Sequence, residues 1–290
     1  MSILSLGSST ACMSPYIHLS TSLLQNNMSQ EIGQLLSQLV ETAPPGELEE
    51  VHNDLVSIVP SQLSVVSKTV TRLAENQGML LSGKGIAHQE NKDSASGKFW
   101  DFKEKKKYNT SFKGGKVYDV EAATPTAEYP AFYDDLSKNL EQYGDKHFPS
   151  EFAFEIVPVS STKVSITLIG QKLNKSNFYT GRWHSHYVFE KSQTTHGEIA
   201  LDIHYYEEGN VRLDFKETVD EPCEFSADAI VEFIRSTENA VSIKAINQFN
   251  VLNQKYFKNL RRLLPVTKSK INWGNAIGNY KLGSDVVNER

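Results

Sequence analysis

Cysteine is scarce in this chain, and the short motifs that usually carry catalysis are missing. The 290 residues include two cysteines, Cys12 and Cys223, which show neither the spacing of metal ligands nor a disulfide framework. Neither a G-x-x-x-x-G-K-[ST] loop nor a G-x-G-x-x-G loop is present, so the sequence does not support nucleotide hydrolysis. These absences favour a reducing compartment and predict no catalytic residue, no metal site and no cofactor.

Charge is missing from the N-terminus. The first charged residue is Glu31, so the preceding stretch lacks the basic segment of a signal peptide. Ser, Thr and Asn interrupt the apolar residues of this stretch too often for a membrane span. We therefore expect residues 1–28 to form a disordered extension and the chain not to be transmembrane.

Proline and glycine are absent between Ser226 and Leu264, and Pro265 ends this run. Apolar residues recur there at close to the helical period, which predicts one amphipathic helix over residues 225–264 with Ser226 as its N-cap. Such a helix would span roughly 58 Å, far more than an average globular helix. We expect its apolar stripe to lie across a sheet of its own chain, with a second subunit covering the remainder. The stripe residues assigned to a dimer interface are Ile230, Phe233, Ile234, Val241, Phe249 and Leu252.

The segments before this helix predict its platform. Residues 29–77 carry three short amphipathic patterns and predict a helical bundle, whereas residues 78–128 predict short strands and loops, with the lysine run at 103–107 in solvent. A helix is expected over 129–150. Alternating apolar residues over 151–219 predict an antiparallel β-meander whose apolar face receives the long helix. This order is typical of an α+β protein. The predicted apolar face of the first helix in the bundle consists of Ile32, Leu35, Leu36 and Leu39.

Acids are absent from the stretch KYFKNLRRLLPVTKSKINW, residues 255–273. It carries six lysines and arginines, although the whole chain has a net charge of −5. Such a concentration of positive charge predicts a contact with an acidic partner. After Pro265, apolar residues recur at helical spacing and predict a second, short amphipathic helix. We expect residues 265–290 to form a basic amphipathic arm, which either folds back onto the core or stays mobile and contacts another protein.

Two other functions fit parts of the sequence. His184 and His186 form an H-x-H pair on one face of a predicted strand, with His196 and His204 on the next strand. With a third ligand and a water, such a pair would hold Zn²⁺ in a metal-dependent enzyme. No H-E-x-x-H motif accompanies it, and partly exposed sheet histidines are the simpler interpretation. The basic tail would also fit a nucleic-acid-binding protein, but the rest of the chain is acidic and carries no nucleic-acid-binding module.

Four strings of the sequence occur together in one known family. They are TAPPGELEEVHNDL from Thr42, NFYTGRWHSHYVFE from Asn177, IHYYEEGNVRL from Ile203 and LRRLLPVTKSKINW from Leu260. In this order, across about residues 29–283, the chain resembles the alpha subunit of the heterodimeric F-actin-capping protein. The resemblance implies an N-terminal helical bundle, a sheet continued across a structurally similar beta subunit, and two long antiparallel helices over that joint sheet.

The resemblance also implies a function. The C-terminal arm, with its counterpart on the beta subunit, would hold the barbed end of an actin filament and block the addition and loss of actin subunits, without severing. It implies a cytoplasmic place in the cortical actin cytoskeleton, inhibition by phosphatidylinositol bisphosphate, and no nucleic-acid partner. Basic family positions that contact actin correspond to Lys258, Arg262 and Lys268, and the lysine at 268 departs from the arginine common there, losing its bidentate fork. The full set assigned to actin binding is Lys258, Arg261, Arg262, Lys268, Lys270, Trp273, Ile277 and Tyr280.

Overall fold

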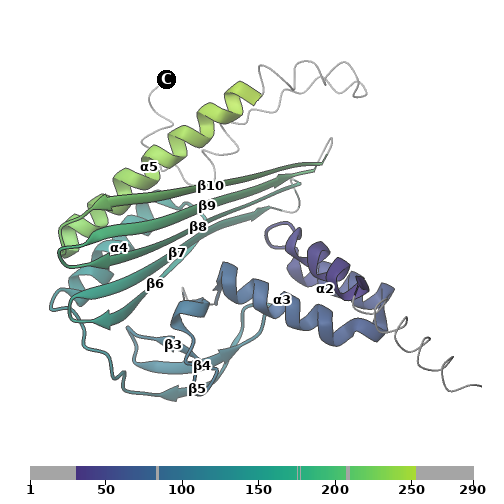
Figure 1. Ribbon diagram of the computed structural model, residues 1–290, viewed down its shortest axis with the longest axis horizontal. Helices are drawn as coiled ribbons and strands as arrows, with labels where there is room; N and C mark the ends of the chain where they lie inside the picture. Colours follow the sequence, from purple (N-terminus) through teal and green to yellow (C-terminus); the bar gives the residue numbers. More distant parts are fainter. Residues whose placement is uncertain (1–30, 83–84, 175, 177, 207–209, 253–290) are drawn as a thin grey trace, which may run out of the picture.

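The chain begins with a group of helices, followed by two small sheets, one large sheet and a long helix (Figure 1). The computed structural model describes residues 31–82, 85–174, 176, 178–206 and 210–252. A helix over residues 31–41 precedes α2 (Leu48–Ile58) and α3 (Leu63–Gln77), and the 3₁₀ helix η1 (Pro60–Gln62) joins the last two. The three amphipathic patterns of the sequence therefore do form three helices.

The first helix turns a different face inward from the one predicted. Leu36 and Val40 are buried and pack with residues of α2 and α3, whereas Ile32, Leu35 and Leu39 are exposed. The prediction was right for Leu36 and wrong for the other three residues, because this helix carries apolar side chains on two sides and its neighbours cover only the side of Leu36 and Val40.

Short strands occupy the middle of the chain, as predicted. They are β1 (Met79–Leu80), β2 (Ile86–Ala87), β3 (Phe99–Asp101), β4 (Lys106–Thr110) and β5 (Val117–Ala122), with the 3₁₀ helix η2 (Gln89–Asn91) between β2 and β3. The lysine run is not wholly in solvent, because β4 starts at Lys106. The Lys107 Nζ atom lies 2.7 Å from Asp93 Oδ2 and 4.3 Å from the centre of the Trp100 ring. An ion pair and an aromatic face therefore hold a lysine that the charge pattern placed in a loop.

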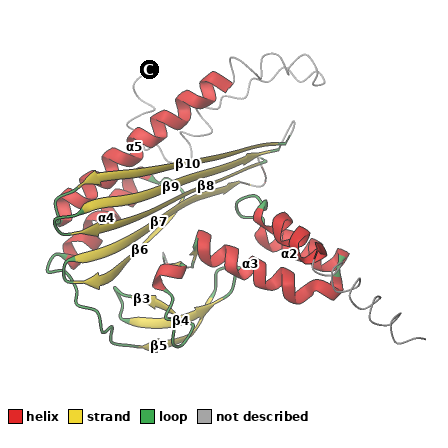
Figure 2. Ribbon diagram, viewed as in Figure 1, coloured by secondary structure: helices red, strands yellow, loops and turns green. Residues whose placement is uncertain are grey.

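The large sheet is the predicted antiparallel meander (Figure 2). Its strands are β6 (Glu151–Ser160), β7 (Lys163–Asn174), β8 (Tyr179–Glu190), β9 (Thr194–Tyr205) and β10 (Val211–Pro222). They lie in the order β10-β9-β8-β7-β6, and each pairs antiparallel with the next. The last strand continues three residues beyond the predicted end at 219.

Two helices cover one face of this sheet, α4 (Tyr133–His147) and α5 (Ala227–Leu252) (Figure 1). The helix α4 starts later than predicted. Pro130 disfavours helical geometry at the residue before it, so the first helical turn forms only after Pro130. The helix α5 begins directly after Ser226, as predicted, and its predicted continuation to 264 lies outside the described residues. Between helices and sheet is an apolar layer in which the rings of Trp183, Tyr187 and Phe189 are at most 1% exposed.

Two glycines allow α4 to lie close to the sheet. A Cβ atom on Gly144 of α4 would come within 1.9 Å of the Phe152 ring, and one on Gly170 of β7 within 2.2 Å of the Phe148 ring. The two phenylalanine rings stack on each other with centroids 4.7 Å apart. A larger residue at either glycine would therefore displace this ring pair and separate α4 from β6 and β7.

Three histidines join the N-terminal part of the chain to the other face of the sheet. The ring of His88 lies 5.5 Å from that of His184 and 6.0 Å from that of His186, centroid to centroid. His88 Nδ1 accepts a hydrogen bond from the backbone N–H of Glu90 at 3.3 Å. Its Nε2 is therefore the protonated nitrogen and donates to the carbonyl of Asn76 at 3.0 Å.

Burial lowers the pKa of all three rings. The pKa of His88 falls from its usual value of 6.5 to about 4, because of burial, then the nearby His186, with Arg182 contributing least. Burial, followed by Arg182 and the other two histidines, holds the pKa of His184 well below its usual range. Burial also lowers the pKa of His186, although nearby carboxylates oppose the shift. The folded chain therefore keeps these rings neutral under conditions in which the unfolded chain would protonate them.

We expect the free energy of unfolding to decrease as the pH falls below about 6.5. Because the folded-state pKa values are depressed, the stability they reflect is complete above the unfolded pKa and is lost as the pH approaches the folded values. For His88 alone the loss amounts to at most ~3 kcal/mol between about pH 7 and pH 4. Urea unfolding across this range measures how steeply the free energy of unfolding falls with pH. His184→Gln should make this dependence shallower.

The exposed His196 provides the control. Its hydrogen bond to Asp220 raises its pKa, so its contribution is present below the unfolded pKa and disappears as the pH rises. His196→Gln should leave the acid-induced loss of stability in place or make it slightly steeper. If the free energy of unfolding of His184→Gln depended on pH as steeply as that of the wild type, the buried rings would not cause the acid-induced loss of stability.

Candidate interaction surfaces

The long helix buries most of its apolar stripe within its own chain. The side chains of Ile230 and Ile234 are 0% exposed, and those of Val241 and Phe249 are at most 4% exposed. All four pack in one cluster with the sheet and α4. Phe233 is half-buried and meets two aromatic rings of β8 edge-on. The prediction that the apolar stripe lies across a sheet of its own chain is therefore confirmed.

Among the described residues, the outer side of α5 carries exposed apolar side chains. Ile243 is 58% exposed and Val251 is 47% exposed, and Lys244 between them pairs with Glu217 of β10 at 2.6 Å. Leu252 ends the described part of α5. Because five of the six residues assigned to a dimer interface pack against their own sheet, the interface role of this set stays a prediction.

The strand β10 forms one edge of the large sheet. Among the described residues it pairs with β9 alone, over its whole length from Val211 to Pro222. Its second edge therefore presents a row of backbone N–H and C=O groups, which is the usual template for adding another strand. Leu213 and Phe215 on this strand pack into the core under the helices, so a strand added here would extend the same apolar layer.

The first helix carries a further unpartnered surface that the sequence interpretation missed. Ile32, Leu35 and Leu39 are 38%, 56% and 44% exposed and lie at helical spacing on one side. Sequence periodicity contained the signal, since the helix has more apolar positions than one face can hold. Three exposed apolar side chains in a row are typical of a surface that another protein covers.

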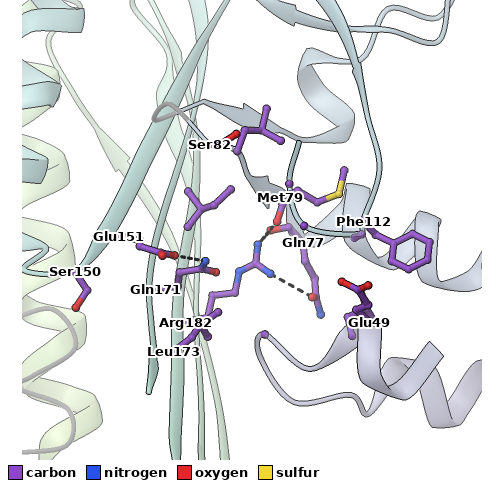
Figure 3. A pocket seen from close by; sticks show the side chains of 18 of the residues that line it. Glu49, Gln77, Met79, Ser82, Phe112, Ser150, Glu151, Gln171, Leu173 and Arg182 are labelled. Carbon is purple, nitrogen blue, oxygen red and sulfur yellow. Dashed lines mark hydrogen bonds between the residues drawn. The ribbon is translucent and has the colours of Figure 1, made fainter. Parts of the chain in front are cut away.

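A cleft of about 740 Å³ separates α2 and α3 from the sheet (Figure 3). Arg182 of β8 lies in it and donates from Nη2 to the carbonyl oxygens of Gln77, at 2.6 Å, and Gly78. On the other side Glu151 accepts a hydrogen bond from Gln171 at 2.6 Å. The guanidinium thus connects the C-terminal end of α3 to the sheet, and these hydrogen bonds give it a structural role.

The histidines of the sheet are accounted for by packing and hydrogen bonds. His186 Nδ1 lies 3.2 Å from Thr167 Oγ1, and His204 Nε2 lies 2.8 Å from Asn210 Oδ1. Within the residues that the structure describes, no three His, Cys, Asp or Glu side chains are placed to hold a metal ion. The arrangement therefore does not support the metal-dependent alternative built on His184 and His186.

The arm lies beyond the part of the chain that the structure describes. All of the residues assigned to actin binding, from Lys258 to Tyr280, are outside it, as is the predicted extension 1–28. Their roles stay predictions. In the described ranges, none of the helices has the length and apolar character needed to span a membrane.

Comparison with known proteins identifies the family of the chain. The profile of the family described as F-actin capping protein alpha subunit matches residues 36–285. The F-actin-capping protein subunit alpha of Debaryomyces hansenii is 48% identical over 268 residues, covering 91% of this chain and 100% of the relative. That of Candida albicans is 41% identical over 282 residues, with the same two coverages.

A solved structure shows the same fold. The homodimeric actin capping protein alpha subunit from Plasmodium berghei superposes with a TM-score of 0.64 at 16% identity, over 83% of this chain and 99% of that one. The sequence match extends through most of the chain, including the basic stretch 255–273. This chain belongs to the F-actin capping protein alpha subunit family.

Proposed function

We propose that this chain is the alpha subunit of a heterodimeric capping protein that binds the barbed ends of actin filaments. It blocks the addition and loss of actin subunits there and does not sever filaments. The observation that carries the proposal is the family match over residues 36–285, which includes the basic stretch and the arm. Such a function requires a complementary surface that dissociates slowly, and it requires no catalytic residue.

The unpartnered surfaces support a beta subunit as partner. The exposed side of the helix over 31–41, the free edge of β10 and the outer side of α5 are all apolar or carry open backbone groups. A chain of similar fold would continue the sheet at β10 and cover the outer side of α5. This accounts for an apolar surface that a lone chain would leave in water.

The positive charge of residues 255–273 supports this stretch as the site that binds actin. Residues 255–273 are basic while the whole chain is acidic, so an acidic surface of actin is a fitting partner for that stretch. The same charges would attract the headgroup of phosphatidylinositol bisphosphate, which we propose as an inhibitor. We place the protein in the cytoplasm, in the cortical actin cytoskeleton, and propose no nucleic-acid partner.

Elongation of pyrene-labelled actin from barbed-end seeds tests the proposal. With a co-expressed beta subunit, substoichiometric protein should stop elongation, and the number of filaments should not rise, because capping involves no severing. Undiminished elongation with a folded heterodimer would refute capping. A salt-dependent complex with DNA and none with actin would favour the nucleic-acid alternative.

The chain expressed alone should aggregate or be unstable. Without a partner, the apolar side of the first helix and the free edge of β10 face water, and partner binding stabilises only the folded state. Sedimentation and thermal melting of the chain with and without the beta subunit measure this. A monodisperse monomer with a cooperative melt equal to that of the heterodimer would contradict it.

Replacing Lys258, Arg262 and Lys268 together with Ala should slow the association of the heterodimer with barbed ends. Exposed charges act mainly on the association rate, and removing them should also make capping less sensitive to salt. Single-filament capping rates at low and high salt provide the measurement. Replacing the exposed lysines Lys68, Lys138 and Lys146 of the described body with Ala is the matched control, and an equal effect there would argue against a specific site.

Trp273→Ala should mainly raise the dissociation rate. Burying this indole against a partner stabilises the complex by roughly 2 to 3 kcal/mol, equal to a factor of about 30 to 150. Uncapping of single filaments measures the rate, and the melting temperature of the heterodimer should stay unchanged. If the melting temperature drops by several degrees while capping per folded molecule stays the same, the terminal helix docks on its own core.

A further inference from the structure

Glu238 places a carboxylate inside the apolar layer between α5 and the sheet. Its side chain is 0% exposed, in the middle of the helix that covers the sheet. Neighbours in the layer include Ile234 and Val241 on the same helix and the aromatic rings of β8. Burying an ionisable group at such a position destabilises the fold unless hydrogen bonds satisfy it. Its hydrogen-bond partners therefore indicate its role.

Hydroxyl groups from two other elements point at this carboxylate. Tyr143 of α4 donates to Oε2 at 2.5 Å, and Ser185 of β8 donates to Oε1 at 2.5 Å. Tyr187 lies 3.4 Å from the same Oε1. Trp183 Nε1 donates to Ser185 Oγ at 2.6 Å, which leaves the serine proton free for the carboxylate. The carboxylate is thus the common acceptor of Tyr143, Ser185 and Tyr187, and Trp183 donates to the serine oxygen.

The two phenols keep their protons for this purpose. Burial, followed by the charge of Glu238, raises the pKa of Tyr143 and of Tyr187 well above the usual range. Both therefore remain donors over the whole physiological pH range. Hydrogen bonds that converge on one acceptor in a dry layer are stronger than exposed ones, because water does not compete for them.

Only one placement of α5 satisfies this network. Ile234 and Ser242 lie one helical turn to either side of Glu238, and a slip of one turn moves the helix by about 5.4 Å. Such a slip would still set apolar residues against the layer at several positions, for example Ile234 in place of Ile230. It would also set Ile234 or Ser242 against the tyrosine and serine hydroxyls and leave the carboxylate among apolar side chains.

Contacts at the surface of α5 add little to this selection. Asn139 donates to Asp228 at 2.8 Å near the start of the helix, and Lys244 pairs with Glu217 at 2.6 Å further along. Both contacts are exposed, and exposed polar pairs contribute weakly because water competes for them. The buried carboxylate is therefore the group that distinguishes one register from the next.

We infer that Glu238 is a positioning residue that fixes the rotation and axial register of α5 on the sheet. Because residues 255–273 follow α5 in the chain, Glu238 thereby sets the point from which the basic stretch approaches actin. This step rests on the proposed capping function. A single buried polar group is a known means of selecting one register of a helix over nearly equivalent ones.

Distance measurement between spin labels tests the register directly. Labels at Ser161→Cys, in the exposed β6–β7 turn, and at Ser236→Cys, at an exposed position of α5 before Ile243, would be placed in the heterodimer with Cys12 and Cys223 changed to Ser. We expect a narrow distance distribution in the parent, and a broadened one, or one shifted by about one helical turn, in Glu238→Gln. Glu232→Gln is the matched control, since Glu232 is an exposed acid of the same helix.

Tyr143→Phe provides a second variant that keeps the ring and removes one donor. It should broaden or shift the distance distribution as Glu238→Gln does. It replaces Glu238→Gln in the test if that variant lowers the yield of folded heterodimer. Unchanged distributions in both variants, or equal broadening in Glu232→Gln, would overturn the inference.

Capping kinetics separate this inference from the proposed function. With sedimentation confirming an intact heterodimer, the rate of uncapping should rise roughly tenfold in Glu238→Gln and stay unchanged in Glu232→Gln. A changed distance distribution with an unchanged uncapping rate would refute the link from register to actin. Parent heterodimer that fails to cap, with the expected distance changes, would refute the capping function and leave the register role standing.

Discussion

The packing of α4 and α5 on one face of the five-stranded sheet is the interaction on which the rest of the structure depends. Every second residue of β8 faces this layer, and Trp183, Tyr187 and Phe189 bury nearly their whole side chains in it. Aromatic side chains of this size each remove a large apolar area from water, which makes this layer the main source of stability. Gly144 and Gly170 permit the close approach that the layer requires.

Two buried acids show how differently the chain treats a carboxyl group. Glu238 receives hydroxyl donors from two elements, which satisfy it as an acceptor inside the layer. Glu155 lies on the opposite face of β6, where burial and then the charge of Asp101 raise its pKa well above the usual range, despite the hydrogen bond from the Phe102 N–H. The first carboxyl group is used for its hydrogen bonds, whereas burial favours the neutral form of the second.

The other face of the sheet is connected to the N-terminal helices through polar contacts. Arg182 reaches the end of α3, and His88 stacks near His184 and His186. Such contacts are directional and fewer than those in the apolar layer, so they fix an orientation with less contribution to stability. Among the described residues, the chain therefore combines one strongly packed layer with a polar junction and with exposed surfaces at β10, the first helix and the outer side of α5.

The sequence by itself determined the class of the fold, the order of its elements and the family. Alternation over 151–219 predicted the meander because strand periodicity is local, and the gap without Pro or Gly after Ser226 predicted α5 for the same reason. Family membership followed from strings such as NFYTGRWHSHYVFE. The tertiary structure alone decided which face of the first helix points inward, since Ile32 and Leu36 are equally apolar and only the neighbouring helices distinguish them. It also placed Glu238 beside Tyr143 and Ser185, 95 and 53 residues away in the chain, because pairings over such distances depend on how the layers stack and leave no periodic trace in the sequence.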